Sequence, residues 1–172
     1  MMSELLKKAR DFEDVHRREI SREERPDFHL TGGCGWINDP NGFSFYNGEY
    51  HLFYQYHPYS NEWGPMHWGH VKSKDMLVWE RLPVAMAPDE AYDNAGCFSG
   101  SAIELSDGRH LLMYTGVEET KGEDGSIVSR QAQCMAVGDG VNYEKYEGNP
   151  VITPESLPQG GRPSDFRDTK IW

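Results

Sequence analysis

The chain has 172 residues, of which 12% are aromatic, and a formal net charge of −11. This length is enough for one ordinary domain with a real core. The acidic balance argues against nucleic acid or an anionic membrane as a partner, because both attract basic surfaces.

Residues 1–26 are predicted to be a helical lead-in, with one amphipathic helix over residues 3–20. One face of this helix carries apolar and aromatic side chains: Leu5, Ala9, Phe12 and His16. Ser3 is a suitable N-cap, and Arg25-Pro26 ends the helical pattern. The segment is charged throughout and lacks the apolar stretch of a secretory signal, and no run in the chain reaches membrane-spanning length. We therefore expect a cytoplasmic protein.

The cysteines predict free thiols rather than a disulfide framework. Cys34, Cys97 and Cys134 are odd in number, widely spaced and outside any Cys-x-x-Cys pair, so neither disulfides nor a zinc site is indicated. Four histidines fall on strand or aromatic-rich positions: His51, His57, His67 and His70. We expect them to lie in the core or in hydrogen bonds, and we predict no metal and no cofactor.

The run from Gly35 to Gly42 reads Gly-Trp-Ile-Asn-Asp-Pro-Asn-Gly and contains one carboxylate, Asp39. Pro40 restricts the backbone, and the Asn-Gly pair after it favours a tight turn. Asp39 is therefore a positioned carboxylate, while Asn38 and Trp36 are available to hydrogen-bond and stack on a ring-shaped polar ligand. The alternative is a purely structural Asx-type turn that caps a hairpin.

After this run the hydrophobic period becomes two, which predicts two hairpins. Their arms are residues 43–46 with 49–55, and residues 67–74 with 78–82. Asn47-Gly48 predicts a type I′ turn in the first hairpin, and Asp75-Met76 is the expected turn of the second.

The two hairpins recur later in the chain in the same order. Residues 48–54 align with 108–114, 60 positions on, and residues 75–81 align with 139–145, 64 positions on. Four-stranded units that repeat in this way are typical of β-propeller blades, although a β-meander sandwich is an alternative.

We therefore predict an all-β chain that follows the lead-in as one partial propeller domain, residues 27–172. It would hold the first two blades and the start of the third of a five-bladed β-propeller. The expected blades are about 36–83 and about 97–146, with blade three starting at 164–172.

Several motifs in this chain resemble those of glycoside hydrolase family 32, the invertases, sucrose-6-phosphate hydrolases and fructanases. The run at 35–42 resembles the sucrose-box motif of that family. Residues 54–58 with 63–64, residues 98–102 and Arg167-Asp168 resemble its later motifs, and they occur in the family's order.

The resemblance implies hydrolysis of a β-fructofuranosidic bond, as in sucrose or sucrose 6-phosphate, with retention. It implies that Asp39 is the catalytic nucleophile and that Asp168 stabilises the transition state by holding sugar hydroxyls. It also implies a set of substrate-binding residues: Trp36, Asn38, Gln55, Trp63, Phe98, Ser99 and Arg167. Independently, Asp39, Ser99 and Asp168 precede or open the first strands of successive units, so we expect them to face one pocket.

Two departures from the family pattern stand out. Thr169 occupies the position of the proline that follows the third-motif Asp in the family. The family's acid/base Glu, in a Glu-Cys pair further along, has no counterpart among the Glu residues here, so we expect a fragment without its proton donor. The alternatives are an inactive truncated propeller that binds sugar weakly or self-associates through open blade faces, and a fructosyltransferase.

Overall fold

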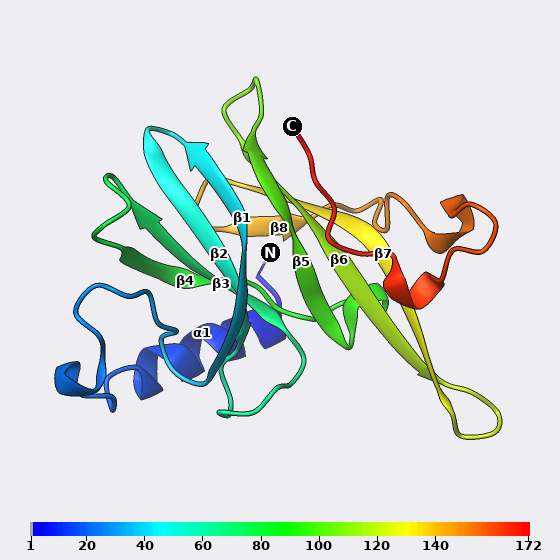
Figure 1. The fold of residues 1–172 in the computed structure, drawn as a ribbon, viewed down its shortest axis with the longest axis horizontal. Coiled ribbons are helices and arrows are strands. Elements are labelled where there is room, and N and C mark those ends of the chain that lie inside the picture. The colour runs from blue at the N-terminus through cyan, green and yellow to red at the C-terminus, as the bar shows by residue number, and fades with distance from the viewer. Residues whose placement is uncertain (1) are drawn as a thin grey trace.

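The computed structural model describes residues 2–172 as one helix followed by two four-stranded antiparallel sheets (Figure 1). The helix is α1 (Glu4–His16), which ends four residues earlier than predicted. The first sheet consists of β1 (Trp36–Tyr46), β2 (Glu49–His57), β3 (His67–Ser73) and β4 (Glu80–Met86). The second consists of β5 (Gly96–Glu104), β6 (His110–Lys121), β7 (Ile127–Gly138) and β8 (Tyr143–Lys145). Both are meanders in which consecutive strands are neighbours.

The predicted apolar face of α1 was partly wrong. Ser3 caps the helix as predicted, and its hydroxyl accepts a hydrogen bond from the Leu6 N–H at 3.1 Å. The buried residues are Leu6, Ala9 and Glu13, whereas Leu5 is 47% exposed. The helix is rotated so that a carboxylate, rather than a further apolar side chain, enters the interface with the first sheet.

The predicted tight turn within the 35–42 run was also wrong, because β1 passes through it. Pro40 lies opposite Tyr54 and Asn41 opposite Phe53, with register shifts on both sides of this pair. Such irregularities tolerate a residue without an N–H donor and bend the strand locally. Gly42 has a φ of 56°, in the left-handed region that favours glycine. Asp39 is therefore carried on an irregular strand.

The turn of the first hairpin was predicted correctly, whereas the two-residue turn predicted for the second hairpin is shorter than the loop in the structure. Asn47 and Gly48 have φ values of 47° and 81°, as a type I′ turn requires. In the second hairpin the Asp75 carboxylate accepts hydrogen bonds from the Leu77 and Val78 N–H groups, at 2.8 and 2.9 Å. These contacts hold the segment as a loop, so β4 begins two residues later than predicted.

The two sheets pack face to face around one apolar core. Phe53 and Trp68 of the first sheet pack with Leu112, Tyr114 and Cys134 of the second, and all five are nearly inaccessible. The opposite face of the first sheet is covered in part by α1. The first sheet is thus buried against the second on one face, while its other face is covered only in part and leaves Phe43 and Phe45 half exposed.

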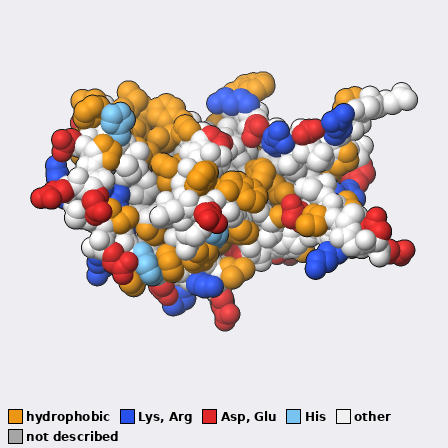
Figure 2. Space-filling view, turned by 60° about the horizontal axis from the view of Figure 1, so that its bottom comes forward, with side chains coloured by type: hydrophobic (Ala, Val, Ile, Leu, Met, Phe, Trp, Pro, Cys, Tyr) orange, Lys and Arg blue, Asp and Glu red, His pale blue; other side chains and the backbone are white. Residues whose placement is uncertain are grey.

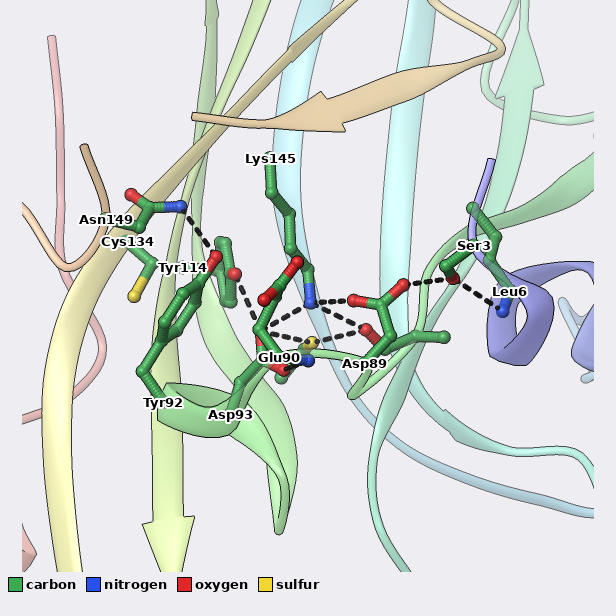
Figure 3. A network of polar contacts seen from close by, with 12 residues as sticks. Ser3, Leu6, Asp89, Glu90, Tyr92, Asp93, Tyr114, Cys134, Lys145 and Asn149 are labelled. Carbon is green, nitrogen blue, oxygen red and sulfur yellow. Dashed lines mark hydrogen bonds and ion pairs between the residues drawn. The ribbon is translucent and has the colours of Figure 1, made fainter. Parts of the chain in front are cut away.

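A buried ion-pair network ties the helix and the connection between the sheets to the second sheet (Figure 3). Lys145, on the last strand, forms ion pairs with Asp89 and Asp93 in the connection between the sheets. Asp89 also accepts a hydrogen bond from the Ser3 hydroxyl, and Asp93 accepts one from Tyr114 at 2.8 Å. Burial raises the pKa of Asp93. Burial opposes the charge of Lys145 as well, but its acidic neighbours raise its pKa.

The segment expected to open a third blade, residues 164–172, contains no strand. A short 3₁₀ helix, η4 (Pro163–Asp165), leads into it. The chain then runs beside β5, where the Ser101 hydroxyl donates to the Thr169 carbonyl at 2.8 Å and accepts from the Ile171 N–H at 2.9 Å (Figure 1). A first strand exists only through pairing with a second, and the described residues provide no second strand beside it.

On one face, hydrophobic side chains are exposed in several places between acidic and basic groups (Figure 2). Within the described residues, no helix is both long and apolar enough to cross a membrane.

Candidate active site

Asp39 lies near the start of β1 with its carboxylate exposed and held from two sides. The amide nitrogen of Asn38 donates to Oδ1 at 2.8 Å, and the hydroxyl of Ser99, on β5 of the second sheet, donates to Oδ2. Two donors on different strands restrict the rotation of the carboxylate while leaving it open to solvent. This is the arrangement expected of a reactive group that must be both aimed and accessible.

A short chain of hydrogen bonds joins this carboxylate to Asp168. The Ser99 carbonyl lies 3.2 Å from the Thr115 hydroxyl, which accepts a hydrogen bond from the Asp168 N–H at 3.1 Å. The Asp168 side chain is 61% exposed, and Arg167 lies beside it with 3.6 Å between Nε and Oδ2. The structure therefore brings Asp39, Ser99 and Asp168 into one neighbourhood, as the strand positions indicated. Their chemical roles stay predictions.

Aromatic residues lie on the same strands as these polar groups: Phe98 directly precedes Ser99 on β5, and Trp36 opens β1 three residues before Asp39. The rings of Trp63 and Phe98 meet edge to face with centroids 6.5 Å apart, and Trp63 is 58% exposed. The Trp68 indole N–H donates to the Phe98 carbonyl at 3.2 Å, which anchors the backbone there. The indole nitrogen of Trp36 is buried without a hydrogen-bond partner. Exposed rings next to polar groups suit the apolar faces and hydroxyl edges of a sugar.

Two predicted binding residues are engaged by the protein itself. Gln55 is 3% exposed, and its amide nitrogen donates to the Cys97 carbonyl at 3.0 Å. Arg167 lies 3.3 Å from both the Ser164 carbonyl and the Asp165 carboxylate. These contacts orient both side chains, and their contact with a substrate stays a prediction.

Sequence reasoning missed Thr115 and Gln133. Both are buried, and both contact the segment that carries Asp168. The sequence contains a signal for Thr115: the 60-residue repeat aligns it with Gln55, and each of the two follows a tyrosine. Gln133 has no comparable signal, because its partners in the Asp168 segment, the Phe166 carbonyl and the Thr169 hydroxyl, lie more than 30 positions away.

The carboxylates lie on an open surface. A hollow of about 630 Å³ exists elsewhere, at the opposite end of β1, where it is lined by residues such as Tyr46, Arg109 and Tyr146. It contains none of the predicted site residues, so volume alone does not locate the chemistry. Among residues 2–172, no three His, Cys, Asp or Glu side chains gather as a metal site.

An oriented, exposed carboxylate with amide, hydroxyl and aromatic groups around it, at one edge of two packed sheets, is a lining typical of carbohydrate-active proteins. Residues 29–172 match the N-terminal domain of the glycosyl hydrolases of family 32. The chain belongs to glycoside hydrolase family 32.

Similar proteins agree with this assignment. The chain is 47% identical over 157 residues to a sucrose-6-phosphate hydrolase of Zymomonas mobilis, which covers 91% of this chain and 29% of that protein. It is 47% identical to a raffinose invertase of Escherichia coli, covering 86% of this chain and 29% of the relative. The chain therefore spans less than a third of the length of these relatives.

Solved structures support the fold. The Bombyx mori family 32 β-fructofuranosidase BmSUC1 matches with a TM-score of 0.83 and 42% identity, over 96% of this chain and 33% of that one. With its two meander sheets, the chain forms part of a β-propeller, so the predicted fold class is confirmed and the sandwich alternative is excluded.

Proposed function

We propose that the complete protein containing this chain hydrolyses β-fructofuranosidic bonds, as in sucrose or sucrose 6-phosphate, with retention at the anomeric carbon. The observation that carries the proposal is the exposed Asp39 carboxylate, held by Asn38 and Ser99 and linked through one threonine to Asp168. Family membership supports it. The Bombyx mori enzyme has also been solved as a variant in complex with sucrose.

In the proposed reaction Asp39 attacks the anomeric carbon of fructose and forms a covalent intermediate, which water then hydrolyses. The Asn38 and Ser99 donors keep the attacking oxygen aimed. Asp168 and Asn38 hold ring hydroxyls as the positive charge develops, while Trp63 and Phe98 form a wall of the sugar site.

Three further residues complete the proposed subsite. Trp36 lines the site beside the nucleophile, and Gln55 and Arg167 contribute polar contacts to the fructose ring. Their hydrogen bonds, from Gln55 to the Cys97 carbonyl and from Arg167 to the Asp165 carboxylate, give each side chain a defined orientation, which supports this assignment.

The reaction also needs a proton donor about 5–5.5 Å from the nucleophile. We place this acid outside the 172 residues, because no Glu here stands in the expected sequence context. Loss of general acid assistance lowers rates by about 10²–10⁴-fold, so the 172-residue chain should release only trace glucose from sucrose.

The test uses the complete protein with sucrose and with sucrose 6-phosphate. Glucose or glucose 6-phosphate release measures hydrolysis, and ¹H NMR of the first-formed fructose identifies the anomer. Hydrolysis with retention supports the proposal, whereas inversion or inactivity on both sugars contradicts it. Growth of fructose oligomers in place of free fructose would instead identify a fructosyltransferase.

Two further proposals follow from the side chains. Cys34, Cys97 and Cys134 are free and buried, which favours a reducing compartment such as the cytoplasm.

Phe43 and Phe45 are 52% and 56% exposed on β1, which favours association of the 172-residue chain with a second copy through this open face.

A further inference from the structure

We propose that Thr115 and Gln133 are positioning residues that fix the Asp168 carboxylate relative to Asp39. This inference rests on the proposed function, because it assigns these residues to the fructoside site. Neither residue was among those indicated by the motifs.

Both residues project from the rigid centre of the second sheet. Thr115, on β6, is 0% exposed and lies directly opposite Gln133, on β7, which is 2% exposed. Side chains on paired central strands are held far more tightly than side chains on loops. The two therefore form a fixed platform beneath the segment that carries Asp168.

The Thr115 hydroxyl connects the two carboxylates of the site. It accepts the Asp168 N–H at 3.1 Å, and its single proton has two acceptors within 3.2 Å, the Ser99 carbonyl and the Gln133 amide oxygen. Ser99 in turn donates to Asp39. A displacement at this one oxygen would be transmitted to both sides of the site.

Gln133 forms hydrogen bonds to the same segment on either side of Asp168. Its amide nitrogen donates to the Phe166 carbonyl at 2.7 Å, and its amide oxygen accepts from the Thr169 hydroxyl. Asp168 itself has a φ of 62°, a left-handed conformation that is uncommon outside glycine, although aspartate adopts it more readily than most residues. The hydrogen bonds with Thr115 and Gln133 stabilise this conformation.

Thr169 contributes to this arrangement at a position where the chain departs from the family motif. The family motif has proline at this position, which offers neither a hydroxyl nor an N–H donor. Here the threonine hydroxyl supplies a hydrogen bond to Gln133 in its place. A loop that has lost the stiffness of proline is thus tied down by side-chain hydrogen bonds.

The test compares Thr115→Val, which removes only the hydroxyl, with Thr115→Ser, which keeps it, in the complete protein. Because a misplacement of about 1 Å can cost about 10²-fold in rate, we expect kcat on sucrose to fall about 10- to 100-fold in Thr115→Val. We expect KM to change much less, and the serine variant to restore most of the activity. Thr120→Val, an exposed position on the same strand, is the matched control.

A double-mutant cycle separates positioning from general damage. In an Asp168→Asn background, Thr115→Val should lower kcat little further, since both changes act through one group. A Thr115→Val variant that melts like the parent and keeps its kcat, or one whose loss is fully additive to that of Asp168→Asn, overturns the inference.

Amide hydrogen exchange gives a readout that does not depend on activity. Thr115→Val and Gln133→Glu should each accelerate exchange across residues 166–171, whereas Thr120→Val should not. Gln133→Glu also covers the case in which Thr115→Val does not fold. Unchanged exchange in the folded variants rejects positioning, while an inactive parent protein rejects only the proposed function.

Discussion

Two pairs of aspartates in this molecule occupy opposite environments. Asp89 and Asp93 are buried against Lys145, where every charge has a partner (Figure 3). Asp39 and Asp168 are exposed, and the donors around them come from neutral groups and from Arg167 at the edge. Buried, compensated carboxylates hold elements together, whereas exposed, oriented ones remain available to a ligand.

The two pairs of aspartates should respond differently to mutation. A change at the exposed pair should affect activity and leave folding intact. A change at the buried pair or its lysine should lower stability and leave the chemistry of the site intact, because it leaves a buried charged group without an ion-pair partner.

The largest effect is expected at Asp39. Asp39→Asn in the complete protein removes the attacking oxygen anion, and we expect hydrolysis of sucrose to fall by about 10⁴-fold or more. Its free energy of unfolding, from urea denaturation, should change by no more than about 0.5 kcal/mol. Asp124→Asn, in the exposed β6–β7 loop, is the control and should alter neither quantity. Substantial activity in Asp39→Asn would remove this residue from the nucleophile role.

Lys145→Met should have the opposite profile. It leaves the Asp89 and Asp93 carboxylates buried without their cation, which typically costs about 3–5 kcal/mol. Urea denaturation measures this loss, and adding Asp93→Asn to the variant should recover part of it. Lys74→Met, at an exposed position, should be nearly neutral. If Lys145→Met proves as stable as the parent, the network has no structural role.

Acid should weaken the contact between the blades through His110. The two ring nitrogens of this side chain are hydrogen-bonded to the Ser44 hydroxyl at 3.0 Å and to the Tyr143 hydroxyl at 2.8 Å. Burial lowers the pKa of His110 from 6.5 to about 3. The unfolded chain then binds more protons than the folded one below pH 6.5. The contribution of neutral His110 to the free energy of unfolding is fully present above pH 6.5. It decreases toward pH 3 by up to about 1.4 kcal/mol per pH unit.

Urea denaturation at pH 7.5 and pH 5 measures this dependence. His110→Gln should make the slope shallower without removing it, because burial also lowers the pKa of His51, His67 and His70. His29→Gln, at an exposed histidine, should leave the slope unchanged. A slope that is the same in His110→Gln as in the parent would assign the acid sensitivity to other groups.

The smallest effect concerns the open face of the first sheet. Phe43 and Phe45 both pack against Tyr50, with ring centroids 6.0 and 5.1 Å apart, and both remain half exposed. Replacing both with serine should weaken self-association of the 172-residue chain about tenfold, as measured by sedimentation equilibrium. Leu77→Ser, at an exposed loop position, is the control. A parent chain that is monomeric throughout the concentration range would contradict association through this face.

Much of the architecture was readable from the residues alone. Alternating strands, the Asn47-Gly48 turn and the 60-residue repeat predicted the two sheets, because period and turn chemistry are local properties. The motifs around Asp39 and Asp168 likewise indicated the site and the family.

Other features depended on which elements meet. Local pattern could not show that α1 buries Glu13, that β1 passes through Pro40, or that Lys145 lies between two aspartates. Gln133 was missed for the same reason, whereas Thr115 could have been found from its alignment with Gln55 in the repeat. A buried polar side chain is defined by its partners, and these partners lie on other strands or on segments more than 30 residues away. Strand pattern and turns were therefore determined by the sequence itself, while the pairing of buried polar groups was decided only when the blades packed.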